Sequence, residues 1–182
     1  MASHSLSRSS SDETRVVVLT GFMGSGKSTV GPILAARLGW NFMDVDDVIE
    51  METGIPIAQF FQQFGERSFR DRERHTISRL VTGDSLVLAL GGGAIESEAT
   101  RNLLRSTDGL LLVHLDVQLG TTLERCRGTE ATRPILADRA NLAARYELRA
   151  PLYTVAHISI AVDKLTPDQI AENVLKYVKI NP

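Results

Sequence analysis

The chain has 182 residues, of which 43% are hydrophobic and 23% are charged, as is usual for a single globular domain. The 20 basic residues nearly balance the 22 acidic ones, which argues against binding to nucleic acid or to a membrane surface. The single cysteine, Cys126, excludes an intrachain disulfide and fits a reducing compartment, so we expect a cytoplasmic protein.

The first fourteen residues, MASHSLSRSSSDET, are polar and rich in serine. They lack the apolar region of a secretory signal, and no apolar run in the chain approaches the roughly 20 residues of a membrane span. We expect residues 1–14 to form a disordered tail, with a truncated transit peptide as the alternative. Residues 15–182 are expected to form a single domain.

Apolar runs typical of buried strands alternate with helical patterns along the rest of the chain. We expect strands at residues 15–20, within 40–46, and at 85–90, 109–116 and 157–162. Helices are expected at residues 27–38, 46–54, 56–65, 65–83, 97–107, 117–126, 141–156 and 166–178. This alternation predicts an α/β fold, in which helices cover both faces of a parallel sheet and ligands bind beyond the carboxyl ends of the strands.

The segment GFMGSGKS, residues 21–28, matches the pattern G-x-x-x-x-G-K-[ST] in full. It follows a predicted strand and opens a predicted helix, which is the context that the pattern requires. The glycines let main-chain N–H groups surround phosphate oxygens, while Lys27 would reach the β- and γ-phosphates and Ser28 would ligate Mg²⁺. The alternative is a tight turn that binds nothing. We therefore predict a nucleotide-binding loop that includes Gly24, Ser25, Gly26, Lys27, Ser28 and Thr29.

A second acidic site is expected after the short strand, where the sequence reads DVDD at residues 44–47. Nucleotide-binding loops of this kind commonly work with a carboxylate that holds Mg²⁺ from a neighbouring strand. Asp44 and Asp46 would share a face of extended chain, so one could act on the Mg²⁺ shell while the other reaches an acceptor hydroxyl. The alternative is that Asp46 or Asp47 only caps the following helix.

Two arginines and a glycine triplet suggest a pocket for a small carboxylate. Gly91, Gly92 and Gly93 directly follow a predicted strand, where glycines let the backbone approach a ligand closely. Arg70 and Arg149 could bind a carboxylate in bidentate fashion. Taken singly, each arginine could equally be a solvated surface residue, and the glycines could form a plain loop.

The ordered set GFMGSGKST, DVD, GERSFR, GGG, RP and RAPLY resembles the shikimate kinases, over roughly residues 15–178. The resemblance implies a three-layer α/β/α P-loop kinase with a five-stranded parallel sheet and a mobile lid at about residues 125–138. It implies that ATP and Mg²⁺ serve to phosphorylate the 3-hydroxyl of shikimate, and that the protein is a monomer.

The resemblance also implies a role for each matching residue. Lys27, Asp46 and Arg133 would be catalytic, with Asp46 orienting the acceptor hydroxyl or taking its proton and Arg133 closing onto the phosphates from the lid. The nucleotide would also contact Arg125 or Arg127 at the adenine, and Asp44 would bind water on Mg²⁺ beside Ser28. Glu73, one helical turn from Arg70, would fix that arginine. The residues implied to bind shikimate are Asp46, Arg70, Gly91, Gly92, Gly93 and Arg149, with Phe61 and Phe69 as walls.

Two other functions remain open from the sequence. One is a related small-molecule kinase, for a sugar acid such as gluconate or for a nucleotide, although the combination of DVD, GGG and RAPLY disfavours a gluconate kinase. The other is a non-catalytic ligand-sensing domain descended from such a kinase. The complete set Lys27, Ser28, Asp46 and Arg133 favours an enzyme.

Overall fold

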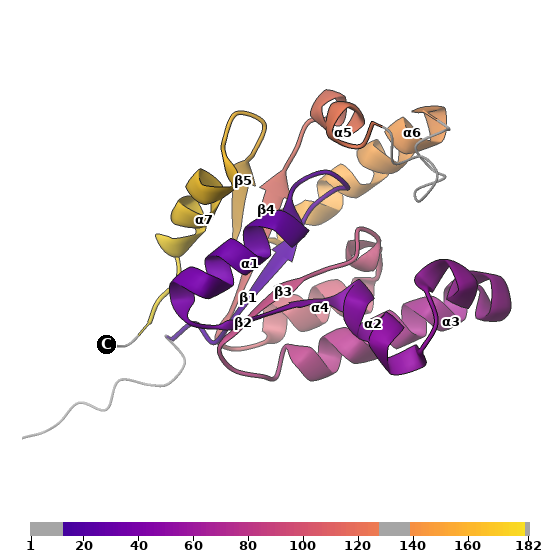
Figure 1. Ribbon diagram of the computed structural model, residues 1–182, viewed down its shortest axis with the longest axis horizontal. Coiled ribbons are helices and arrows are strands. Elements are labelled where there is room, and N and C mark those ends of the chain that lie inside the picture. The colour runs from indigo at the N-terminus through magenta and orange to yellow at the C-terminus, as the bar shows by residue number, and fades with distance from the viewer. Residues whose placement is uncertain (1–12, 128–138, 181–182) are drawn as a thin grey trace, which may run out of the picture.

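Five parallel strands form one sheet at the centre of the protein (Figure 1). The computed structural model describes residues 13–127 and 139–180. The strand order is β2-β3-β1-β4-β5, and the strands are β1 (Val16–Thr20), β2 (Asn41–Asp44), β3 (Leu86–Ala89), β4 (Leu110–Asp116) and β5 (Ile158–Ala161). All five lie within the segments predicted from sequence, so the expected parallel sheet is confirmed.

Helices cover both faces of this sheet, which gives the expected three layers (Figure 1). One face carries α1 and α7, and the other carries α2, α3 and α4. The helices are α1 (Lys27–Leu38), α2 (Val45–Thr53), α3 (Ile57–Leu80), α4 (Glu98–Ser106), α5 (Leu119–Arg125), α6 (Arg139–Arg149) and α7 (Pro167–Leu175), with short 3₁₀ segments η2 (Ala94–Glu96) and η4 (Ala150–Val155). In the described part of the chain, no helix is both long and apolar enough to cross a membrane.

The central strand β1 supplies both halves of the core. Val17 and Leu19 pack on the side of α1 and α7, whereas Val16 and Val18 pack on the side of α2, α3 and α4, and none is more than 1% exposed. Successive side chains of a strand point to opposite faces, so a fully apolar strand needs cover on both. The uninterrupted run of apolar residues therefore places β1, and the loop that follows it, at the middle of the sheet.

Several helix ends follow the predicted signals. Gly39 ends α1 in the left-handed conformation with φ 69°, and Thr166 starts α7 with a capping box that includes Gln169. The helices predicted at 56–65 and 65–83 meet inside α3 at Gly65, whose φ of 76° and ψ of 169° break the helical geometry. These local signals fix the end of α1, the start of α7 and the break inside α3.

The helix predicted at residues 141–156 is wrong at its end. Instead, α6 stops at Arg149 and the chain continues as the 3₁₀ segment η4. Pro151 accounts for the difference, because it lacks an N–H donor and disfavours the α conformation of the residue before it. The early end leaves Arg149 in the last turn of α6.

Candidate functional site

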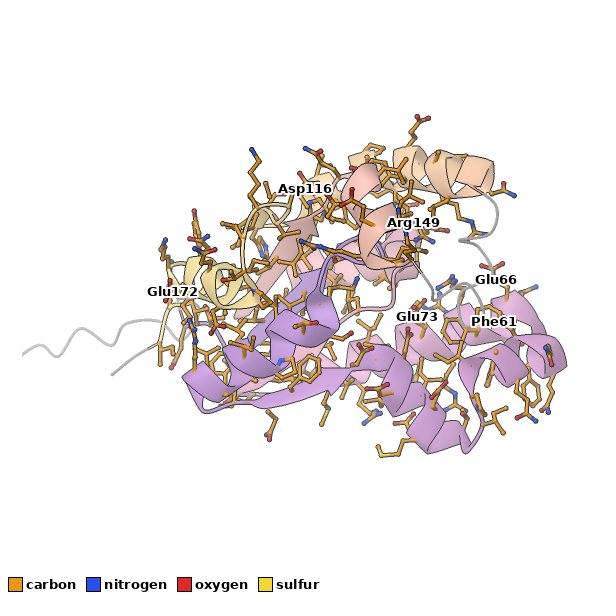
Figure 2. The ribbon with its side chains drawn as sticks, turned by 45° about the horizontal axis from the view of Figure 1, so that its top comes forward. Phe61, Glu66, Glu73, Asp116, Arg149 and Glu172 are labelled. Carbon is orange, nitrogen blue, oxygen red and sulfur yellow. The ribbon has the colours of Figure 1, made fainter. Side chains whose placement is uncertain are left out.

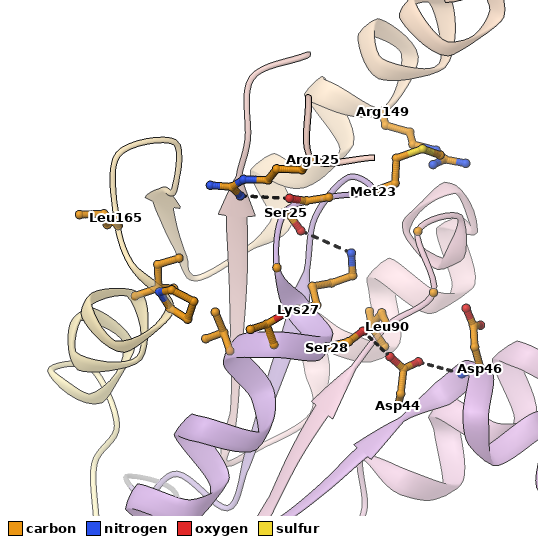
Figure 3. Close-up of a pocket in the computed structure, with 18 residues that line it drawn as sticks. Met23, Ser25, Lys27, Ser28, Asp44, Asp46, Leu90, Arg125, Arg149 and Leu165 are labelled. Carbon is orange, nitrogen blue, oxygen red and sulfur yellow. Dashed lines mark hydrogen bonds between the residues drawn. The ribbon is translucent and has the colours of Figure 1, made fainter. Parts of the chain in front are cut away.

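A pocket of about 670 Å³ opens at the carboxyl ends of β1, β2 and β3 (Figure 3). This is the edge of a parallel sheet at which ligands are expected. Its lining combines the loop after β1 with residues from the ends of β2 and β3 and from α6, α5 and α7. The lining residues are Met23, Gly24, Ser25, Gly26, Lys27, Ser28, Thr29, Val30, Asp44, Asp46, Leu90, Gly91, Gly92, Arg125, Arg149, Leu165, Pro167 and Ile170.

The loop after β1 has the backbone of an anion-binding nest. Gly24 and Gly26 adopt positive φ values of 73° and 96°, which only glycine reaches readily, and α1 begins immediately afterwards. Lys27 folds back over this loop, where its Nζ donates to the carbonyls of Gly21 at 2.8 Å and Phe22 at 3.2 Å. The loop thus presents backbone N–H groups, a helix N-terminus and an ammonium group on one side of the pocket.

Helix α5 supports the loop from behind. The Thr122 hydroxyl donates to the Met23 carbonyl at 3.1 Å, and Arg125 Nη1 donates to the Gly24 carbonyl at 3.0 Å. The Cys126 sulfur lies 3.1 Å from the position that a Cβ on Gly24 would occupy. These three residues hold the loop in shape, a role that the sequence did not reveal for Thr122 or Cys126.

The two arginines predicted for the adenine end differ in position. Arg125 lines the pocket beside Leu165 and Pro167, and its Nη2 also donates to the Val162 carbonyl at 3.1 Å. Arg127 is exposed and is not among the lining residues. The geometry therefore favours Arg125 over Arg127 for a contact with the base. Leu165 and Pro167, which sequence reasoning missed, face the pocket from the loop before α7 and from its first turn.

Asp44 connects the phosphate loop to Asp46. The Ser28 hydroxyl donates to Asp44 Oδ2 at 3.0 Å, while the Asp46 backbone N–H donates to Asp44 Oδ1 at 3.1 Å (Figure 3). Asp44 is thus the N-cap of α2, which corrects the alternative in which Asp46 or Asp47 caps that helix. The expectation that Asp44 and Asp46 share a face of extended chain is also wrong, because α2 begins at Val45 and Asp46 lies in its first turn.

The carboxyl group of Asp46 has an unusual electrostatic environment. Burial raises its pKa to about 7, and the neighbouring carboxylates of Asp44 and Glu73 contribute in the same direction. The positive charges of Lys27 and Arg70 oppose this shift. A carboxyl with a pKa near neutrality can exchange a proton at physiological pH, which is what a general base requires.

Arg70 and Glu73 form an ion pair beside the glycine triplet. Arg70 Nη1 donates to Glu73 Oε2 at 2.8 Å, and the Glu73 side chain is only 3% exposed. Burial raises the pKa of Glu73, and Arg70 opposes the increase. A Cβ on Gly93 would lie 2.5 Å from Arg70 Nη2, so the guanidinium packs directly on this backbone. Arg70 and Gly93 do not line the pocket themselves but stand next to its wall.

Gly91 separates the carboxylates of Asp46 and Glu73. A Cβ at this position would lie 2.8 Å from both Asp46 Oδ1 and Glu73 Oε1. In the described part of the protein, Glu73 Oε1 is a buried oxygen without a hydrogen-bond partner. The glycine is therefore required by space, since only a hydrogen atom fits between the backbone and the two carboxylates.

Arg149 reaches the same end of the pocket from α6 (Figure 3), and Figure 2 shows where its side chain lies in the whole protein. It is only 4% exposed, its Nε donates to Glu96 Oε1 at 2.6 Å, and its Cζ lies 5.4 Å from the centre of the Phe22 ring. Its Nη1 lies 3.5 Å from the position of a Cβ on Gly92, so the terminal nitrogens face the glycines. Glu96 was not anticipated, because no local pattern marks its contact with Arg149.

The structure thus gathers most of the predicted site residues and leaves a few apart. The rings of Phe61 and Phe69 lie 4.5 Å apart between centres, tilted by 34°, beside Arg70 and outside the pocket lining, so their role as walls stays a prediction. Arg133 and residues 128–138 of the expected lid lie outside the described residues. What the structure brings together is an anion-binding loop, a carboxyl with a pKa near 7 and two buried or half-buried arginines with glycine backbone between them.

Comparison with known proteins gives a consistent result. The shikimate kinase family model matches residues 23–179. The chain is 40% identical to the shikimate kinase of Sulfurihydrogenibium sp. over 90% of its own length and 97% of the relative's. It is 38% identical to that of Persephonella marina, over 91% and 99% of the two chains. Among solved structures, shikimate kinase from Acinetobacter baumannii in complex with shikimate superposes with a TM-score of 0.83 at 34% identity, over 91% of this chain and 93% of that one.

Proposed function

The chain belongs to the shikimate kinase family, and from that membership we propose that it transfers the γ-phosphoryl group of ATP to the 3-hydroxyl of shikimate. The observation that carries this proposal is the division of one pocket into two ends. One end is the anion-binding loop with Lys27, which suits the phosphates of ATP. The other end has Arg149 with Gly91 and Gly92, which suit a small carboxylate such as that of shikimate.

Asp46 lies between these two ends and is the group we assign to proton transfer. It lines the pocket with Lys27 and Gly91, and its pKa of about 7 suits a base that works near neutral pH. In the proposed reaction Asp46 accepts the proton of the acceptor hydroxyl as the oxygen attacks the γ-phosphorus and the bond to the β-phosphate oxygen breaks. Lys27 stabilises the charge that spreads over the transferred group.

The proposed Mg²⁺ site uses Ser28 and Asp44. Mg²⁺ prefers oxygen ligands and in kinases takes only one or two protein groups, because phosphates and water complete its shell. The hydroxyl of Ser28 and the carboxylate of Asp44 are 3.0 Å apart at the N-terminus of α1, so the donor set fits such an ion. When bound, the metal would neutralise phosphate charge, while Asp44 keeps the position of Ser28 and starts α2.

We further propose that Arg70 and Arg149 bind the shikimate carboxylate, and that Gly91, Gly92 and Gly93 hold the substrate through backbone. Arg125 would contact the adenine opposite Pro167, and Arg133 would close onto the phosphates. The monomeric state and cytoplasmic location expected from sequence also stay predictions.

Neither alternative function has comparable support. A gluconate kinase would not account for the glycine triplet together with Arg149 of the RAPLY segment. The relatives and the solved structure described for this chain are shikimate kinases, and they match it over most of its length. A sensing domain would not need a carboxyl with a pKa near 7 beside the phosphate loop. Both alternatives nevertheless predict distinct outcomes in the assay that follows.

The test measures ADP release by the full chain with Mg²⁺-ATP and shikimate, in parallel with gluconate and with no acceptor. Release that depends on shikimate and is absent from both controls supports the proposal, and ³¹P NMR of the product identifies the phosphorylated hydroxyl. Turnover with gluconate alone would contradict the assigned acceptor but leave the phosphate loop intact. Binding of shikimate by calorimetry without any turnover would instead indicate a sensing domain.

A further inference from the structure

Glu96 occupies a position that the proposed reaction does not yet explain. It ends η2, the 3₁₀ segment that directly follows the glycine triplet, and its carboxylate meets Arg149 Nε at 2.6 Å. Within residues 13–127 and 139–180, it is the only carboxylate in an ion pair with Arg149. We infer that Glu96 is a positioning residue that holds Arg149 in the orientation required to bind the acceptor carboxylate. This inference rests on the proposed function.

Arg149 is a buried cation that needs an opposite charge nearby. The Arg149 side chain is only 5% exposed, and a cation removed from water without a partner carboxylate is strongly unfavourable. The Phe22 ring beneath Arg149, 5.4 Å from its Cζ, offers a weak cation–π contact but no hydrogen-bond acceptor. Glu96 therefore supplies the opposite charge that offsets the cost of burying the Arg149 guanidinium at the wall of the pocket.

Glu96 contacts Arg149 away from the terminal nitrogens of its guanidinium. Glu96 contacts Nε, on the side of the guanidinium, whereas Nη1 lies 3.5 Å from the Cβ position of Gly92 at the pocket wall. Glu96 is not among the residues that line the pocket, and 35% of its side chain is exposed. A carboxylate that competed with substrate would be expected at the terminal nitrogens. Glu96 instead leaves those nitrogens for the ligand and fixes the plane of the guanidinium through its Nε.

Glu96 is itself held in place by its neighbours. Arg101 Nη1, on α4, donates to the carbonyls of Ile95 at 2.8 Å and Glu96 at 2.9 Å. The Glu96 N–H donates to the Gly93 carbonyl at 3.0 Å, and Ile95 is 1% exposed. The orientation of Arg149 is thereby coupled to the backbone of the glycine triplet, so both sides of the acceptor pocket are aligned together.

The experiment compares the wild-type chain with Glu96→Ala, Glu96→Gln and the control Glu98→Gln. Glu98 is an exposed acidic residue only two positions away on α4, so its replacement changes the net charge equally without touching Arg149. Shikimate Kd is measured by calorimetry, and KM for shikimate, KM for ATP and kcat are measured by ADP release. Melting temperatures show whether each variant remains folded.

We expect Glu96→Ala to raise the shikimate Kd and KM roughly tenfold or more, because the hydrogen bond to a charged group is lost and Arg149 can turn away. The KM for ATP should stay within about twofold, since the nucleotide end of the pocket is unchanged. Glu96→Gln should recover part of the affinity, because its amide oxygen still accepts from Nε. Glu98→Gln should behave as wild type.

Two outcomes would overturn the inference. Tighter shikimate binding by Glu96→Ala would mean that Glu96 competes with substrate, and unchanged binding would mean that Arg149 needs no positioning. The Arg149→Ala background supplies a further check: there, Glu96→Ala should have no additional effect on the shikimate Kd, and a full additional loss would contradict action through Arg149. Absence of shikimate turnover in the wild-type chain would count against the proposed function rather than against Glu96, whose effect on binding is measured separately.

Discussion

Asp46 and Glu73 direct a carboxylate oxygen at the same backbone position, each 2.8 Å from where a Cβ on Gly91 would stand. Two acids that face one glycine disfavour each other's ionised forms. Burial raises the pKa of both groups, and the charges of Asp44 and Glu73 help to raise that of Asp46 to about 7. The arrangement links the group assigned to proton transfer with the group that orients Arg70.

The first prediction concerns the pH dependence of the reaction. Because Asp46 must be ionised to accept a proton, we expect kcat/KM to rise with pH and level off above about 7. Asp46→Asn should lower kcat roughly 10²–10⁴-fold and remove this acidic limb. Steady-state rates measured from about pH 5.5 to about pH 9 test both parts. A near-normal rate in Asp46→Asn would exclude Asp46 from the chemistry.

The second prediction concerns Lys27. Its Nζ reaches over the phosphate loop to the carbonyls of Gly21 and Phe22, at the nucleotide end of the pocket. Lys27→Ala should lower kcat at least roughly 10²-fold, the scale of one preorganised charge lost from a transition state, while leaving the shikimate Kd little changed. Lys176→Ala, which removes an exposed lysine of the C-terminal segment, is the matched control. Equal activity of the two variants would contradict the role of Lys27.

The third prediction concerns Gly91. The Cβ of Gly91→Ala would lie 2.8 Å from both Asp46 Oδ1 and Glu73 Oε1, so Asp46 or Glu73 must move. We expect a loss of about 1–3 kcal/mol in the free energy of unfolding, as for overpacked sites, and weaker shikimate binding. Gly120→Ala is the control, because nothing lies within 4 Å of its Cβ position and alanine favours the helix α5. A Gly91→Ala variant as stable and as tightly binding as wild type would show that the carboxylates have room.

How much of the site could be predicted from sequence depends on the range of each signal. The loop around Lys27 could be predicted because strand, glycines and helix start are adjacent along the chain. The role of Asp44 as N-cap could not be chosen within DVDD, since each aspartate there can cap a helix. The contact of Glu96 with Arg149 joins residues 53 positions apart. It could not be predicted, because no sequence motif marks Glu96. It depends on where α6 ends, which the sequence prediction placed too late.

The last prediction concerns folding stability without ligand. Asp46 has a pKa of about 7 in the folded state and about 3.8 when exposed. At a pH between these two values, the folded state therefore holds a proton that the unfolded state has released. The contribution of Asp46 to the free energy of unfolding is therefore highest below about pH 4. It falls by up to about 1.4 kcal/mol per pH unit until the pH reaches about 7. Lys27 and Arg70 limit the loss, whereas Asp44 and Glu73 increase it. Asp46→Asn should thus be more stable than wild type at pH 8 and gain little at pH 4.5, as measured by urea unfolding, while Asp108→Asn, an exposed control, should show no such pH dependence. If Asp46→Asn were no more stable than wild type at pH 8, the ionised Asp46 would carry no cost in the empty pocket, and its assignment as a base tuned by burial would fail.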